Sequence, residues 1–144
     1  MLIGIPHIVS PGLLAVLMEM GHGDELVIAD ANFPAHSMAR AAHGRVVRAD
    51  GSGVAELLDA ILTLFPLDYA VRAPIFGMEG PEGPPAIHGA LREVLARHGY
   101  GPDKMELLCK ADFYERAAHS YAVLASGEPA RFANLIIKKG VVDR

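Results

Sequence analysis

The segment Met20–Asp30, MGHGDELVIAD, decides the fold, because it joins the end of a helical pattern to a buried strand. His22 stands between two glycines, and glycine lets the backbone turn sharply and lets a ligand approach it closely. The run Glu25–Ala29 is short and rich in apolar residues, which is typical of a strand buried on both faces. Asp30 follows at the far end of that strand. The segment therefore predicts a helix end, a turn and a strand, with an ionisable side chain at each end of the strand.

The residues before this segment predict a helix. Ser10 and Pro11 are the residue types preferred at an N-cap and at the first helical position. Apolar residues then repeat at helical spacing, at Leu13, Leu14, Leu17 and Met18. Gly21 lies where such a helix would end.

Helix and strand patterns alternate along the rest of the chain. Short apolar runs predict strands at residues 45–49, 70–78, 105–110, 121–126 and 135–137. Helices are predicted from after Ser37 to near Gly44, along the apolar stripe from Val54 to Phe65, and over residues 86–98. A further short helix is predicted to begin near Asp112, because Asp112 and Glu115 have the spacing of a capping box. This alternation predicts an α/β fold: a single three-layer α/β/α domain over residues 1–144, with a central mostly parallel or mixed sheet.

The composition excludes several classes of protein. Apolar residues make up 51% of the 144 residues and charged residues 21%, so the chain is not disordered. No apolar run reaches the length of a membrane span, and 13 basic residues against 17 acidic ones leave no surplus for nucleic acid. The only cysteine is Cys109 and the first residues lack the basic segment of a secretion signal, so we expect a cytoplasmic protein. The apolar excess is assigned to subunit interfaces.

Several motifs have simple structural interpretations. The stretch Gly51–Gly53 is too short for a phosphate loop and is expected to be a helix-entry turn. The seven histidines include no pair at the helical spacing of a zinc site, so no metal is expected. Cys109 is expected to be a buried thiol within a strand. Arg48 and Asp50 are expected to form a local ion pair.

Other residues remain open between a structural and a functional role. His22 could be an exposed histidine at a helix C-terminus, or a group that transfers protons near neutral pH. Asp30 could be a helix N-cap, although its place at the carboxyl end of a strand favours ligand binding. Taken alone, Asp68 and Asn134 could be turn residues and Tyr114 a core residue.

The chain resembles the fucose mutarotase and ribose pyranase family, and within it the fucose mutarotase branch. Seven ordered blocks carry this resemblance: Ser10–Leu14, Met20–Glu25, Phe33–Ser37, Arg48–Gly51, Pro66–Asp68, Phe113–Ala117 and Lys138–Val141. The resemblance implies a ribose pyranase-like fold and an isomerase that interconverts the α and β anomers of a free aldose, most simply L-fucose. It also implies a ring-shaped homo-oligomer, commonly a decamer, with the site at or near subunit contacts.

The resemblance implies roles for particular residues. The catalytic histidine of the family falls on His22, and its sugar-binding positions fall on Asp30, Asp68, Met78, Tyr114 and Asn134. Two departures concern substrate binding, because Phe132 stands where the family usually has tyrosine and Lys110 where it often has arginine.

The expected chemistry needs no cofactor. Mutarotation delivers a proton to the ring oxygen while the anomeric hydroxyl loses one, and His22 with the Tyr114 hydroxyl could exchange these protons. Asp30 could accept sugar hydroxyls or orient the imidazole, and Met78 could supply an apolar wall for a deoxy carbon. Two alternatives remain: a non-catalytic sugar-binding or sensing module of the same fold, and ribose pyranase activity.

Overall fold

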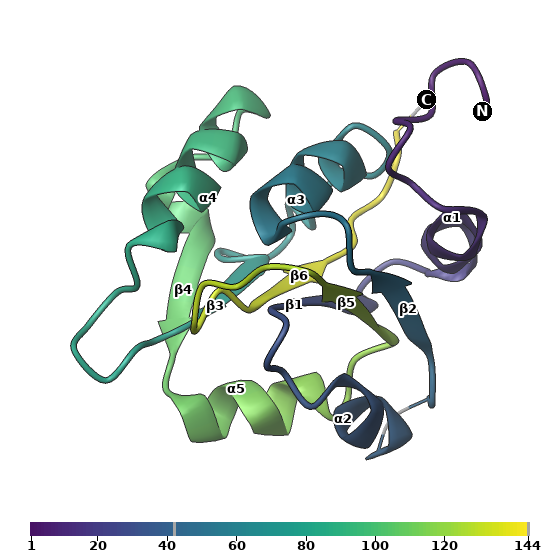
Figure 1. The fold of residues 1–144 in the computed structure, drawn as a ribbon. Coiled ribbons are helices and arrows are strands. Elements are labelled where there is room, and N and C mark those ends of the chain that lie inside the picture. Colours follow the sequence, from purple (N-terminus) through teal and green to yellow (C-terminus); the bar gives the residue numbers. More distant parts are fainter. Residues whose placement is uncertain (42, 144) are drawn as a thin grey trace.

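The computed structural model describes residues 1–41 and 43–143, and one six-stranded sheet forms its centre (Figure 1). The strands are β1 (Glu25–Ala29), β2 (Val46–Ala49), β3 (Ile75–Met78), β4 (Met105–Leu108), β5 (Ala122–Ser126) and β6 (Leu135–Lys138). The helices are α1 (Pro11–Glu19), α2 (Ala35–Ala41), α3 (Val54–Leu62), α4 (Ile87–Arg97) and α5 (Lys110–Ala117), with a short 3-10 helix, η1 (Pro102–Lys104).

The sheet is mixed, with the strand order β2-β5-β1-β6-β3-β4. Strand β6 runs antiparallel to its neighbours β1 and β3, and the remaining pairs are parallel. In the β1–β6 register, Glu25 lies opposite Lys138 and Ile28 opposite Leu135. The carboxyl end of β1 therefore lies beside the amino end of β6, and this arrangement places the candidate site.

Helices cover both faces of the sheet, as expected from the sequence. Figure 1 shows α1, α3 and α4 on one face and α2 and α5 on the other. The core accordingly divides in two: Leu26 and Ile28 of β1 pack with α1, α3 and α4, whereas Val27 and Ala29 pack with α2 and α5. This alternation along a strand buried on both faces confirms the predicted α/β/α layers.

The local signals around the opening segment are confirmed. The Ser10 side chain accepts a hydrogen bond from the Leu13 backbone N–H, and Pro11 begins α1. The helix ends at Glu19, and β1 has the bounds that the apolar run predicts. Gly53 precedes α3 as its N-cap residue, so Gly51–Gly53 is a helix-entry turn.

Other boundaries differ from the sequence prediction. Strand β3 begins only at Ile75, because bends and turns occupy the apolar residues before it. Strand β4 ends at Leu108 and α5 begins at Lys110, so Asp112 lies inside the helix and is not its cap. Cys109 is the N-cap residue of α5 and is exposed, so the expectation of a buried strand thiol is wrong. The predicted helix after Ser37 begins earlier, at Ala35, and residue 42 near its end lies outside the described residues.

Within the described ranges, 1–41 and 43–143, no helix is both long enough and apolar enough to cross a membrane.

Candidate active site

Asp30 and Asn134 meet where the carboxyl end of β1 lies beside the amino end of β6. The Asp30 backbone N–H donates to Asn134 Oδ1 at 2.8 Å, and Asn134 Nδ2 donates to Asp30 Oδ2 at 2.9 Å. The backbone N–H of Asn32 donates to the other Asp30 carboxylate oxygen at 2.9 Å. Both side chains are buried, with 4% of Asp30 and 3% of Asn134 exposed. The carboxylate is therefore held in one orientation and keeps lone pairs for a further donor.

Asn134 also contacts Met78, because its Nδ2 lies 3.8 Å from the Met78 Sδ atom. A side-chain amide has two N–H hydrogens, and here they are directed at Asp30 and Met78. The amide therefore links the carboxylate to the apolar side chain at the end of β3.

These residues line a cavity of about 460 Å³. Six of the residues predicted from the sequence share its wall: Asp30, Met78, Lys110, Tyr114, Phe132 and Asn134. They come from β1, β3, α5 and the segment before β6, which are far apart in the sequence. The cavity combines a fixed carboxylate, a phenol, a cation and apolar surface, which suits a small polyhydroxylated ligand.

Tyr114 is positioned by its neighbours. Its ring stacks on Phe33, with centroids 5.4 Å apart and planes 5° apart. Lys110, one turn earlier on α5, places its Nζ 5.6 Å from the Tyr114 ring centroid. Burial, and to a smaller extent the negative charge of Asp30, raise the pKa of Tyr114 above its ordinary value. The hydroxyl is therefore protonated at neutral pH, so it can donate a hydrogen bond as well as accept one.

His22 forms a second, separate group with Asp68. His22 Nε2 lies 3.3 Å from Asp68 Oδ1, and 53% of the His22 side chain is exposed against 5% for Asp68. Burial acts to raise the pKa of Asp68, but the backbone N–H of Ala70 and the His22 side chain outweigh it, so the pKa is lowered. Asp68 is therefore a carboxylate that can orient the His22 imidazole.

The two groups lie beyond opposite ends of the central strand β1. His22 precedes β1 and Asp30 follows it, and a five-residue strand extends roughly 16 Å. The Gly23 N–H donates to the Lys139 carbonyl at the end of β6, whereas Asn134 precedes the beginning of β6. Within one chain, His22 and Asp68 are therefore not brought to the cavity that holds the other six predicted residues.

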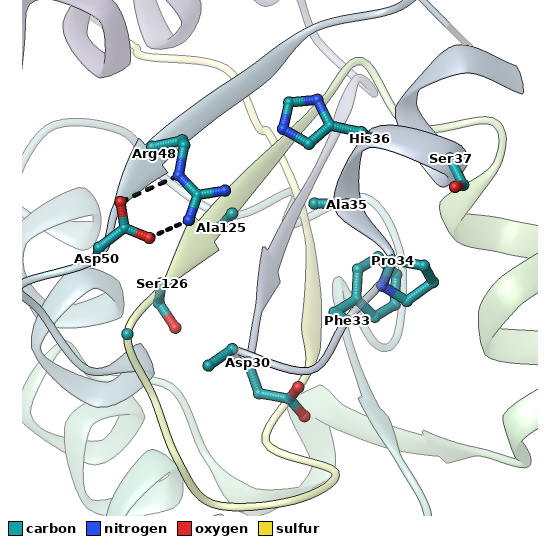
Figure 2. A pocket seen from close by; sticks show the side chains of 12 residues that line it. Asp30, Phe33, Pro34, Ala35, His36, Ser37, Arg48, Asp50, Ala125 and Ser126 are labelled. Atoms are coloured by element: carbon teal, nitrogen blue, oxygen red, sulfur yellow. Dashed lines mark hydrogen bonds and ion pairs between the residues drawn. The ribbon is translucent and has the colours of Figure 1, made fainter.

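A smaller hollow of about 270 Å³ adjoins the cavity, and Asp30 and Phe33 line both. Figure 2 shows Arg48 and Asp50 facing each other in this hollow, with the Asp30 carboxylate turned away from them. Arg48 Nε donates to Asp50 Oδ2 at 3.0 Å, and a second bond joins Arg48 Nη2 to Asp50 Oδ1. These bonds raise the pKa of Arg48 and lower that of Asp50. The predicted local ion pair is confirmed.

Three further cavity residues were not predicted as site residues from the sequence: Asn32, Phe33 and Arg131. Asn32 and Arg131 are exposed loop residues in no recognisable motif, and Phe33 stood out only within a family block. Among residues 1–41 and 43–143, no group of three or more histidine, cysteine, aspartate or glutamate side chains could hold a metal ion.

Comparison with solved structures supports the fold. A structure described as fucose mutarotase in complex with L-fucose, from Streptococcus pneumoniae, is 45% identical, has a TM-score of 0.91, and aligns over 99% of this chain and all of its own. The structure of Bacillus subtilis RbsD complexed with D-ribose has a TM-score of 0.68 at 18% identity, covering 94% of this chain and 95% of its own. The second likeness shows a shared fold.

Sequence comparison reaches the same group of proteins. The L-fucose mutarotase of Actinobacillus pleuropneumoniae serotype 5b (strain L20) is 46% identical over 144 residues, which cover 98% of this chain and 97% of that protein. The RbsD / FucU transport protein family matches residues 3–142. Because the match extends over nearly the whole chain, including both ends of β1 and the cavity between β1, β3 and α5, the protein belongs to the RbsD / FucU transport protein family.

Proposed function

We propose that this protein is a cofactor-independent mutarotase that interconverts the α and β anomers of L-fucose. The observation that carries the proposal is the cavity lined by Asp30, Met78, Tyr114 and Asn134, in which the Asp30 carboxylate accepts two hydrogen bonds and the Asp30 backbone N–H donates a third to Asn134. It is supported by relatives such as the Actinobacillus protein named L-fucose mutarotase. Met78 supplies apolar surface for the C6 methyl group of a 6-deoxy sugar.

The reaction requires two proton transfers and no net change in composition. The anomeric hydroxyl loses its proton as the bond between C1 and the ring oxygen breaks, and the ring oxygen gains a proton. Rotation about the C1–C2 bond and the reverse transfers close the ring on the other face. Asp30 accepts hydrogen bonds from sugar hydroxyls, and the protonated Tyr114 hydroxyl serves one of the transfers. General acid–base catalysis of this kind contributes about 10²–10⁴-fold.

His22 is proposed to serve the other transfer, in the cavity of a neighbouring subunit. Its exposed imidazole is held by a buried carboxylate, which is a suitable arrangement for a group that acts on a ligand outside its own chain. Tyr69, beside Asp68, and Met18 are largely exposed large side chains, and aromatic residues and methionine are enriched at subunit interfaces. The complete site would then require a homo-oligomer, and a closed ring satisfies this requirement for every subunit. A decamer is the ring that we propose, in the cytoplasm.

The two alternatives make different predictions. A sensing module of the same fold would bind L-fucose without accelerating its anomer exchange. A ribose pyranase would act on D-ribose, but the likeness to the ribose-bound structure is at 18% identity and shows the fold alone.

Magnetisation-transfer NMR on the wild-type protein tests the proposal. The exchange rate between anomers is measured for L-fucose, for L-galactose, which differs from L-fucose only by a C6 hydroxyl, and for D-ribose. We expect the largest acceleration for L-fucose and less for L-galactose, because the added hydroxyl would face Met78. Fucose binding in calorimetry without faster exchange would favour the sensing module, and a larger effect on D-ribose would favour the pyranase.

A further inference from the structure

His88 is a buried histidine behind the cavity wall. It is the second residue of α4, and 2% of it is exposed. In the part of the chain that the structure describes, neither of its ring nitrogens has a hydrogen-bond partner. A buried polar group without a partner destabilises the folded state. Core packing alone therefore does not account for a histidine at this position.

The imidazole lies near two backbone segments that carry residues of the cavity wall. One is at Gly77, beside Met78, where an added Cβ would lie 3.1 Å from His88 Cε1. The other is the backbone of Phe132. Burial lowers the pKa of His88, and the nearby Phe132 backbone opposes this lowering only in part. The imidazole is therefore neutral at pH 7, with one N–H to donate.

Phe132 has a strained backbone. Its φ is 60°, and it is the only residue other than glycine with positive φ in the described ranges. The left-handed region is unfavourable for a residue with a large side chain, so it persists where neighbouring groups enforce it. The Phe132 ring lines the cavity together with Met78 and Asn134. The strained backbone of Phe132 thus lies near the unsatisfied buried imidazole of His88, and the Phe132 ring is part of the cavity wall.

We propose that His88 is a positioning residue, whose N–H is directed at the Phe132 backbone carbonyl and holds Phe132 in its left-handed conformation, with the ring in the cavity wall. His88 does not itself line the cavity, so it acts on the ligand through Phe132. In the structure the Phe132 backbone is near the imidazole but lacks the alignment of a hydrogen bond. The effect on sugar turnover rests on the proposed function, whereas the effect on the Phe132 backbone does not.

The first test needs no sugar. Backbone ¹³C chemical shifts of Phe132 report its φ, and they are compared in the wild type and two variants. His88→Leu removes the donor at similar volume, and His88→Gln restores an N–H. The matched control is Val94→Ala, a small loss of core volume on the same helix. We expect Phe132 to leave the left-handed region in His88→Leu and to stay there in His88→Gln and Val94→Ala. If the chemical shifts of Phe132 in His88→Leu still indicate the left-handed conformation, the proposal is overturned.

The second test uses the kinetics of L-fucose anomer exchange. Losing one hydrogen bond corresponds to about a three- to tenfold change in binding, so KM should rise by about that factor in His88→Leu with kcat nearly unchanged. His88→Gln should recover the wild-type KM, and Val94→Ala should keep it despite a lower Tm. An equal rise of KM in Val94→Ala would show a general packing effect and overturn the proposal.

A measurement on the wild type covers the case in which His88→Leu does not fold. In ¹⁵N spectra of the imidazole rings, the His88 N–H should exchange slowly with solvent and show the shift of a hydrogen-bonded donor. A freely exchanging N–H would contradict the proposal. If wild type fails to accelerate anomer exchange, the proposed function fails, while the Phe132 shifts and the imidazole spectra still decide the role of His88.

Discussion

Asn134 is bound to Asp30 in both directions: its Oδ1 accepts the Asp30 backbone N–H at 2.8 Å, and its Nδ2 donates to Asp30 Oδ2 at 2.9 Å. The second N–H of the amide is directed at Met78. No amide hydrogen is then left for a sugar hydroxyl. The geometry assigns to Asn134 the orientation of Asp30 and leaves it no N–H to donate to a ligand.

Replacing Asn134 by alanine should therefore affect both stability and sugar binding. The Asp30 backbone N–H and one carboxylate oxygen would lose their partners, which costs about 1–3 kcal/mol of unfolding free energy, measured by urea denaturation. KM for L-fucose should rise because Asp30 is free to turn. In an Asp30→Asn background, the same substitution should add little to KM, because the two residues act as a unit. Asn32→Ala is the control, since Asn32 binds Asp30 through its backbone. Additive effects on KM would indicate that Asn134 contacts the sugar directly.

The position of His22 leads to a second prediction. His22→Ala should lower the rate of fucose anomer exchange by about 10²–10⁴-fold while fucose still binds in calorimetry. His119→Ala is the control, because His119 is an exposed histidine at the end of α5. Wild-type exchange in His22→Ala would exclude the proposed catalytic role.

Mixing variants tests whether the site is shared between subunits. Neither His22→Ala nor Asp30→Asn should be active alone, but dissociated and reassembled mixtures should recover about a quarter of the wild-type sites by random pairing. Light scattering on the same samples should show a multi-subunit particle. A fully active monomer, or mixtures that stay inactive despite exchanging subunits, would contradict the shared site.

The fold was largely predictable from the sequence, since periodicity reports which faces are buried. The strand Glu25–Ala29 is confirmed residue for residue, because an apolar run bounded by Gly23 and Asp30 has few alternatives. Periodicity failed where apolar runs continue past an element. The run through Leu107 and Leu108 extended the predicted strand over Cys109, although the chain turns there into α5.

The site was predictable in part. Asp30 could be placed because the carboxyl ends of strands in α/β folds bind ligands. His22 and Asp30 are close in the sequence, yet a strand separates them, so proximity along the chain does not bring them together. His88 could not be singled out, because one histidine in an amphipathic helix has no pattern that distinguishes it. Only the three-dimensional packing shows that it lies against Gly77 and has no hydrogen-bond partner among the described residues.

Acid should weaken the contribution of Asp68 to stability. The folded pKa of Asp68 is lowered below the ordinary value of 3.8, by the Ala70 N–H and His22 acting against burial. The carboxylate therefore stabilises the fold above pH 3.8, and this stabilisation is lost as the pH falls through the folded pKa. Asp68→Asn should lower Tm at pH 7, and its difference from wild type should shrink as the pH falls below 3.8. Asp143→Asn, at an exposed position, is the control. A difference in Tm that stays constant with pH would contradict this account.

Phe132 stands where the family usually has tyrosine, and its ring lines the cavity. Phe132→Tyr keeps the ring and the left-handed backbone and adds one hydroxyl. A hydrogen bond to the sugar contributes about 0.5–1.5 kcal/mol, so KM for L-fucose should fall several-fold, or turnover should rise. Phe132→Leu, which removes the ring, should raise KM and controls for the role of the aromatic wall.

If Phe132 instead packs against a neighbouring subunit, the added hydroxyl would leave fucose kinetics unchanged and alter the particle size in light scattering. Measuring both quantities on the same samples separates the two roles, and unchanged kinetics with a changed assembly would rule out the sugar-facing one.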